Sequence, residues 1–225
     1  MYVVVFNFLS FEKIHHLYYN EWGSRWCILK QYADLKLTNE KTKSFIGGNY
    51  ISSKIIDTKL DFICQLDLKK LNIEGLPKEG ILYFFYDLDN NINYDLNNKS
   101  KCLVYYEDKF FKFEHKTNNI PKSYLTTTND NFDVRLLGDA ITIDGDHRLS
   151  IELLDRRYDL SKSPFILPYV KEDAKEKCGE WILLLQVRSN DIIKIGDMGN
   201  LCYYIRKNDL KNLNFTNVYC IKESY

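Results

Sequence analysis

The chain has 225 residues, with 31 Lys and Arg against 31 Asp and Glu, so its formal net charge is zero. This length accommodates one large domain or two small halves that share a core. A balanced charge argues against a nucleic-acid partner, which needs a basic stripe, and against an anionic membrane surface, which attracts basic segments.

The N-terminal residues 1–6 are apolar, but no basic residue precedes them and Asn7 soon interrupts the run. That pattern is a poor secretory signal and predicts a first strand over 2–8. No apolar run approaches the roughly 18 residues that span a bilayer. Without a signal or a dense cysteine framework, we expect reduced thiols and a cytoplasmic location. The six cysteines are Cys27, Cys64, Cys102, Cys178, Cys202 and Cys220.

Short strands and short helices are predicted along the rest of the chain from apolar alternation, helical periodicity and turn residues. A helix is expected to begin at Ser10, with others over 149–158 and 172–178, and one capped by Asn208 or Asp209 and reaching Leu213. Strands are predicted over 28–37, 62–66, 82–87, 102–106, 133–137, 140–143, 181–187, 201–205 and 218–222. Because these elements do not alternate as regular βαβ units, the sequence predicts an α+β fold with largely antiparallel sheets.

Two stretches about half the chain apart resemble each other. Residues 62–86 and 183–205 each contain an apolar strand with a Gln in fourth place, then a turn with Gly, then an aromatic strand. The glutamines are Gln65 and Gln186. A repeat this long predicts duplication of a whole unit. We therefore expect one domain over 1–225, built from two related halves at about 28–120 and 140–225.

A resemblance to a known family rests on residues 62–66 with Leu68, 76–87, 104–106, 181–187, 196–205, 209–210 and Phe215. In these motifs the chain resembles the YwqG family of mostly bacterial proteins of unknown function. The resemblance extends from about residue 28 to the end, with a weak stretch over 108–170. The family's Gly-Gly-x-Pro segment is here Gly47-Gly48 followed by Asn49-Tyr50, and Ile195 stands where a Trp often precedes the Gly-Asp turn. The resemblance implies the fold and a loose association with toxins, but no reaction.

The candidate ligand-binding residues are two turn glycines, one carboxylate and the two amides. In Gly196-Asp197-Met198-Gly199, Asp197 can accept from backbone N–H groups as an Asx-turn, and as a ligand or catalytic group it would need a partner. Gln65 and Gln186 are interpreted as buried amides that hold the two halves together by hydrogen bonds.

Metal sites are not predicted. Residues 87–98 carry alternating Asp and Asn, but a calcium loop needs Gly in sixth place and Glu in twelfth, where this chain has Ile92 and Asn98. A solvated hairpin loop is the preferred interpretation, and cation binding there is left open. His15-His16 diverge on a helix, residues 144–147 read as a surface turn, and no Cys-x-x-Cys pair occurs.

No catalytic residues and no cofactor are predicted, because the chain lacks a P-loop, a dinucleotide fingerprint and a Gly-x-Ser-x-Gly motif. The leading hypothesis is a non-enzymatic binding or protein-interaction module, with 17 Tyr suited to recognition and an immunity-type partner of a toxin as one role. The alternative hypothesis is an enzyme or small-ligand binder with a carboxylate pocket near Asp197. The oligomeric state is not constrained by the sequence.

Overall fold

A computed structural model describes residues 32–89, 101–109, 113–117, 120–143, 146–156 and 174–224. Several predictions concern other residues and lie outside this part of the chain. They are the strand over 2–8, the helix from Ser10, the His15-His16 pair, most of the loop over 87–98 and the start of the turn at 144–147.

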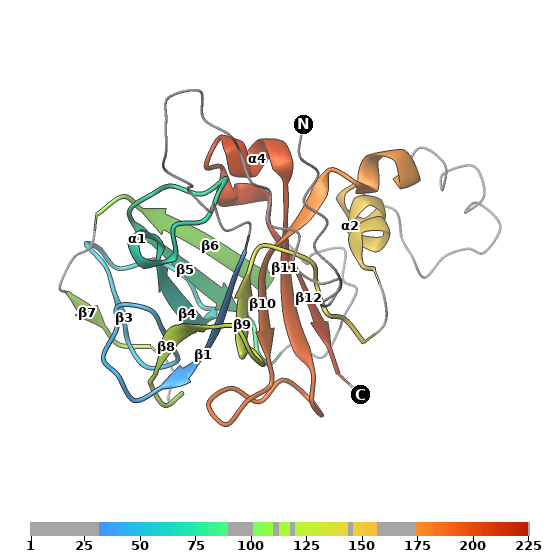
Figure 1. Cartoon of the computed structure of the whole chain (residues 1–225). Helices are drawn as coiled ribbons and strands as arrows, with labels where there is room; N and C mark the ends of the chain where they lie inside the picture. Colours follow the sequence, from blue (N-terminus) through green and yellow to red (C-terminus); the bar gives the residue numbers. More distant parts are fainter. Residues whose placement is uncertain are drawn as a thin grey trace, which may run out of the picture.

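Ten antiparallel strands form one sheet in the order β12-β11-β10-β9-β1-β8-β2-β4-β5-β6 (Figure 1). The strands are β1 Ala33–Thr38, β2 Phe45–Ile46, β4 Asp61–Asp67, β5 Ile81–Tyr86, β6 Cys102–Glu107, β8 Ser123–Thr128, β9 Val134–Leu136, β10 Trp181–Arg188, β11 Asn200–Arg206 and β12 Tyr219–Glu223. A second, two-stranded sheet pairs β3 Tyr50–Ile51 with β7 Glu114–His115.

The described helices are few and short: α1 Leu68–Leu71, α2 Arg148–Asp155, α4 Lys207–Lys211 and the 3₁₀ turn η2 Phe215–Asn217. The α+β prediction is therefore corrected to a mainly antiparallel β fold. The helix predicted over 149–158 corresponds to α2, and residues 174–178 are helical. The last predicted helix is α4, but Arg206 and not Asn208 or Asp209 is its N-cap residue.

The sheet curls into a nearly closed, barrel-like shape with its main core inside (Figure 1). We call β2, β4, β5 and β6 the first wing, and β9, β10, β11 and β12 the second wing. The wings meet across the core, where the rings of Phe84 and Tyr203 pack edge to face with centroids 5.3 Å apart. The Tyr203 hydroxyl donates to Phe85 O at 3.2 Å, and Lys222 Nζ donates to Leu88 O at 3.2 Å. These contacts hold the sheet in its curved shape, and that curvature determines where the outer faces of the two wings lie.

Each wing also has a covered outer face, so that β5 is buried on both sides. The outer face of the first wing is an aromatic cluster with Tyr50 and Phe62 at its centre, next to the small β3–β7 sheet. The outer face of the second wing includes Trp181, and α2 packs on it through Ile151 and Leu154. The outer face of the sheet is thus covered by aromatic side chains on the first wing and by a helix on the second.

The two wings have the same strand pairing. Gln65 stands opposite Tyr83 in β4–β5, and Gln186 stands opposite Cys202 in β10–β11, each three residues after the start of a register shift. The predicted strand–connection–strand arrangement of residues 62–86 and 183–205 is confirmed.

The correspondence extends beyond these hairpins. Phe45 of β2 pairs with Gln65 as Arg135 of β9 pairs with Gln186, and the central strands β1 and β8 pair with each other between the wings. Common descent of the two stretches stays a prediction.

Several segments differ from the predicted elements, among them residues 140–143 and β8. Residues 140–143 are not a strand, because Ile141 is fastened to a side chain of the sheet and not to a neighbouring strand. Strand β8 was not predicted, because Ser123–Thr128 is rich in hydroxyl side chains and only Leu125 among its residues is buried.

Candidate ligand-binding site

Gln65 and Gln186 are fully buried at the outer face of their own wing, where Gln65 fastens the segments before and after β2 and Gln186 fastens the segment after β9. Gln65 Oε1 accepts from Ile51 N at 2.9 Å, and its Nε2 donates to Lys43 O at 2.9 Å. Gln186 Oε1 accepts from Ile141 N at 2.9 Å, and its Nε2 donates to Ile141 O at 2.5 Å. Each amide bonds only residues of its own predicted half of the chain. The interpretation that these amides hold the two halves together is therefore wrong. Their contact with a ligand stays a prediction.

Asp197 lies on the exposed turn before β11. Gly199 N donates to Ile195 O at 2.8 Å, so the backbone closes this turn by itself. Asp197 forms no hydrogen bond with any residue in the described part of the chain, and the predicted Asx-turn is therefore wrong. Gly196 has φ +53°, and a Cβ on Gly199 would meet Glu223 O at 1.9 Å, so both glycines serve the backbone. Their predicted role toward a ligand is not decided by this geometry.

A buried carboxylate, Glu223, joins the edge of the second wing to the start of α2. Its Oε2 accepts from Asn200 Nδ2 at 3.0 Å, and its Oε1 accepts from Ile143 N at 3.0 Å. Nε2 of His147, the N-cap residue of α2, lies 2.5 Å from Glu223 Oε1. Both side chains are about 2 % exposed or less, so this contact lies out of reach of bulk water. The cluster positions the chain on either side of residues 144–145.

Glu107 occupies the corresponding place in the first wing, since it pairs with Ile81 as Glu223 pairs with Asn200. Its carboxylate accepts from Ser53 N at 3.1 Å, from the Ser53 hydroxyl, and from the Tyr83 hydroxyl at 2.8 Å. Burial, and then the bond to Glu107, raise the pKa of Tyr83. Both carboxylates are thus occupied by internal donors, which suits a structural role.

A cavity of about 270 Å³ opens on the outer face of the second wing, beside the start of α2. Its walls come from the segment after β9, from Asp146 before α2, from Arg148 at the start of α2, and from β10 and β11. The lining residues are Gly138, Asp139, Ala140, Thr142, Asp146, Arg148, Ile182, Leu183 and Tyr204. This volume exceeds the 150 Å³ of an apolar cavity that holds benzene.

Polar groups line this cavity at two depths. Arg148 Nε and Nη2 donate to the carboxylate of Asp146 at 2.6–2.9 Å, and both side chains are about half exposed. The hydrogen bond from Arg148 holds the pKa of Asp146 below its usual range. Tyr204 is 2 % exposed, and its hydroxyl forms no hydrogen bond with the residues that the structure describes. Burial raises the pKa of Tyr204, so the phenol stays protonated and has a hydrogen to donate.

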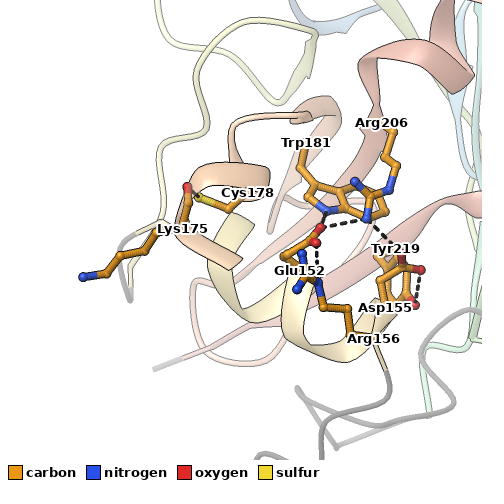
Figure 2. A network of polar contacts seen from close by, with 8 residues as sticks. All are labelled: Glu152, Asp155, Arg156, Lys175, Cys178, Trp181, Arg206 and Tyr219. Carbon is orange, nitrogen blue, oxygen red and sulfur yellow. Dashed lines mark hydrogen bonds and ion pairs between the residues drawn. The ribbon is translucent and has the colours of Figure 1, made fainter. Parts of the chain in front are cut away.

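A second polar network lies one helical turn further along α2, around Glu152 (Figure 2). Glu152 is 1 % exposed and accepts from Trp181 Nε1 at 2.8 Å, from Arg206 Nη2 at 2.7 Å and from Arg156 Nε at 2.7 Å. Arg206 also contacts Asp155 at 2.9 Å. With every oxygen of Glu152 occupied, this network clamps α2 onto β10 and β11.

The buried thiols are unsuited to nucleophilic chemistry. Burial raises the pKa of Cys102 to about 12 and also raises the pKa values of Cys64, Cys202 and Cys220. A reactive cysteine needs the opposite shift, because the thiolate is the nucleophile. Among the described residues, no three His, Cys, Asp or Glu side chains are placed to hold a metal ion.

Residues 39–223 match the family described as a domain of unknown function, DUF1963. The chain belongs to this family. The match covers both wings and the cavity, from the loop after β1 to the end of β12. No curated protein matches the chain. Membership of DUF1963 supplies no activity, and the resemblance to YwqG proteins in particular stays a prediction. No helix in the described ranges is both long and apolar enough to cross a bilayer.

The sequence patterns did not single out the residues that line the cavity. Arg148 and Tyr204 are far apart in the chain, and Ala140 carries no chemical signal of its own. The segment 144–147 was noted as a turn with two carboxylates and an imidazole, and its described residues, Asp146 and His147, do adjoin the cavity. That turn was the one available signal for this site.

Proposed function

We propose that this DUF1963 protein is a non-enzymatic binding protein, and that the cavity beside α2 is its ligand site. The observation that supports this most is the Tyr204 hydroxyl, which has no hydrogen-bond partner in the described part of the chain and belongs to a residue that lines a cavity whose mouth carries the Arg148–Asp146 pair. Ligand sites are hollows with a few convergent polar groups, and the hydroxyl, the guanidinium and the carboxylate are such groups here.

The alternative of an enzyme centred on Asp197 has less support. General acid–base catalysis needs a side chain within hydrogen-bond reach of a second group, and Asp197 is exposed on a turn. Glu107, Glu152 and Glu223 are better placed by burial, but their oxygens accept internal hydrogen bonds. A small-ligand binder remains the part of that alternative that the geometry favours, with its site moved from Asp197 to the cavity.

Screening small fragments by NMR of the ¹⁵N-labelled protein tests this proposal. We expect the backbone amide signals of Gly138 and Ile182, which both line the cavity, to shift together and saturably with at least one fragment. Thr127 and Thr128 line a separate open surface hollow and serve as the internal control, because their signals should stay in place. If a diverse fragment set leaves Gly138 and Ile182 unchanged, the proposed site is wrong.

A protein partner is the second candidate, and two exposed apolar side chains near the start of β11 favour it. Met198 is 77 % exposed and Ile141 is 52 % exposed, and Ile141 O lies 3.5 Å from Asn200 Nδ2, two residues after Met198. Apolar side chains that gather on a surface are typical of interaction sites. An immunity-type role beside a toxin would use such a surface.

Charge substitution tests this surface. Met198→Lys should abolish retention of a partner from the native cytosol, whereas Ile55→Lys, at an equally exposed apolar position between β3 and β4, should not. A partner that both variants retain equally well would exclude the Met198 surface from its interface.

We infer further that the wings arose by duplication and that the protein is related to the YwqG proteins. The matching registers support the first inference, and the quoted motifs support the second. A cytoplasmic location is proposed from the five described cysteines, which are all free. A family tree that separates the chain from YwqG proteins, or fractionation that finds it in an oxidising compartment, would reject the respective inference.

A further inference from the structure

The segment after β9 lacks a side chain that the corresponding segment after β2 possesses. Gln65 fastens Ile51 N in the first wing, and Gln186 fastens Ile141 N in the second, at the same distance of 2.9 Å. The residue before the fastened amide is Tyr50 in the first wing and Ala140 in the second. Ala140 thus holds the position of Tyr50 without its ring.

The ring of Tyr50 fills a space in the first wing, and the residues that form the walls of this space have counterparts in the second wing. It lies 5.7 Å from the ring of Phe62 and 5.5 Å from that of Phe85, centroid to centroid, the second contact being edge to face at 83°. Phe62 pairs with Phe85 in β4–β5 as Leu183 pairs with Tyr204 in β10–β11. Leu183 and Tyr204 both line the cavity, and so does Ala140. The cavity of the second wing therefore lies where the Tyr50 ring lies in the first wing.

We propose that this cavity binds a planar aromatic ring of the size of phenol, which takes the place that the Tyr50 ring takes in the other wing. This inference rests on the proposed binding function and names its ligand class. Aromatic rings prefer edge-to-face contact at centroid distances of about 4.5–7 Å, and Tyr204 presents such a partner, as Phe85 does to Tyr50.

Polar groups around the cavity select a ring with a polar substituent. In the first wing the Tyr50 hydroxyl accepts a hydrogen bond from Ile56 N at 2.9 Å. In the second wing Tyr204 lines the cavity and its hydroxyl bonds no described residue, so it can donate to a ligand oxygen. The Arg148–Asp146 pair at the mouth offers one cation and one anion, which suits a neutral phenol better than a strongly charged group.

The probe for this proposal is p-cresol, which is the side chain of tyrosine as a free molecule. Titration into the ¹⁵N-labelled wild-type protein should shift the amide signals of Gly138 and Ile182 at one site per chain, with a dissociation constant on the order of 1 mM. Ala140→Tyr supplies the missing ring from the chain itself and should abolish these shifts while raising the melting temperature. Tyr204→Phe keeps the cavity wall and removes the donor, so it should fold normally and bind p-cresol at least several-fold more weakly.

Tyr50→Ala is the matched control, because it should open the corresponding cavity in the first wing. This variant should bind two p-cresol molecules, with new shifts at Phe62 and Phe85, and p-cresol should raise its melting temperature more than that of the wild type. A parallel titration with N-acetyltyrosinamide separates the sources of the ring. If both compounds bind equally well, the site is assigned to a tyrosine side chain of another chain. If only p-cresol binds, the site is assigned to a free small molecule.

Persistence of the p-cresol shifts in Ala140→Tyr would overturn the proposal, as would their absence from the wild type. If other fragments shift Gly138 and Ile182 but p-cresol does not, the ring assignment fails and the binding function stands. If neither p-cresol nor any fragment acts there, both fail. Should Tyr50→Ala not fold, Ala140→Tyr and Tyr204→Phe still decide the outcome.

Discussion

Replacing Gly199 by Ala should destabilise the protein by about 3 kcal/mol, at the upper end of the usual cost of overpacking. Gly199 is buried at the junction of the last turn with β11. A Cβ there would lie 1.9 Å from Glu223 O and 2.5 Å from Ile195 O, and neither backbone oxygen can move without disturbing the sheet edge. The destabilisation is steric, because Gly199 has no positive φ.

The matched control is Gly179→Ala, since a Cβ at Gly179 meets no heavy atom within 4 Å. Urea denaturation of the two variants and the wild type gives the comparison, and we expect Gly179→Ala to unfold at the wild-type midpoint. Gly80 precedes β5 as Gly199 precedes β11, with its Cβ position 2.4 Å from Glu107 O, so Gly80→Ala should be similarly severe. A Gly199→Ala protein of wild-type stability would show that the turn can shift, contrary to this account.

The strands with the strongest local signal in the sequence are those that the fold buries on both faces. Ile81–Tyr86 and Asn200–Arg206 are rich in apolar and aromatic residues, and each occupies the middle of a wing. Strand β2 has two residues and β8 has mainly hydroxyl side chains, so neither carries a local signal. Their pairing depends on neighbours far along the chain, and helix propensity over 149–158 drew the prediction toward α+β.

The sequence identified the two glutamines as buried residues, but it did not identify their hydrogen-bond partners. Burial of Gln65 and Gln186 follows from their place in apolar strands, but each bonds a loop that the sequence pattern did not attach to the strand. Asp197 attracted attention because Gly-Asp-x-Gly is a familiar turn pattern. The backbone closes that turn without the side chain, so the pattern reflects the glycines and not the carboxylate.

The candidate cavity could not have been predicted without the register of both wings. Its defining feature is the small side chain of Ala140, which is noteworthy only beside Tyr50 in the corresponding position. The first wing fills its outer face with Tyr50, Phe62 and Phe85. The second wing covers the corresponding face with α2 and leaves one ring-sized space. The same strand arrangement thus has a fully packed outer face in the first wing and a candidate ligand-binding cavity in the second wing.

The second large effect is expected at the polar network around Glu152, which holds α2 against β10 and β11. Glu152→Ala should destabilise the protein by about 3 kcal/mol, the lower end of the cost of removing one partner from a buried ion pair. The substitution leaves Trp181 Nε1 without its acceptor and deprives Arg206 of its contact at 2.7 Å. The cost stays at the lower end because Arg206 keeps Asp155 at 2.9 Å and stacks over the Trp181 ring at 4.4 Å.

Two further variants separate charge from general surface effects. Glu152→Gln preserves the shape and one acceptor oxygen but places an amide donor among donors, so its destabilisation should lie between those of the wild type and Glu152→Ala. Asp191→Ala removes an acidic residue that is 97 % exposed and 3.5 Å from Lys194, and we expect no measurable change, because exposed ion pairs contribute little. Urea denaturation followed by tryptophan fluorescence reports all three, since Trp181 lies in the network itself. Equal stability of Glu152→Ala and Asp191→Ala would mean that α2 is held by Ile151 and Leu154 alone, and that the polar network is incidental to it.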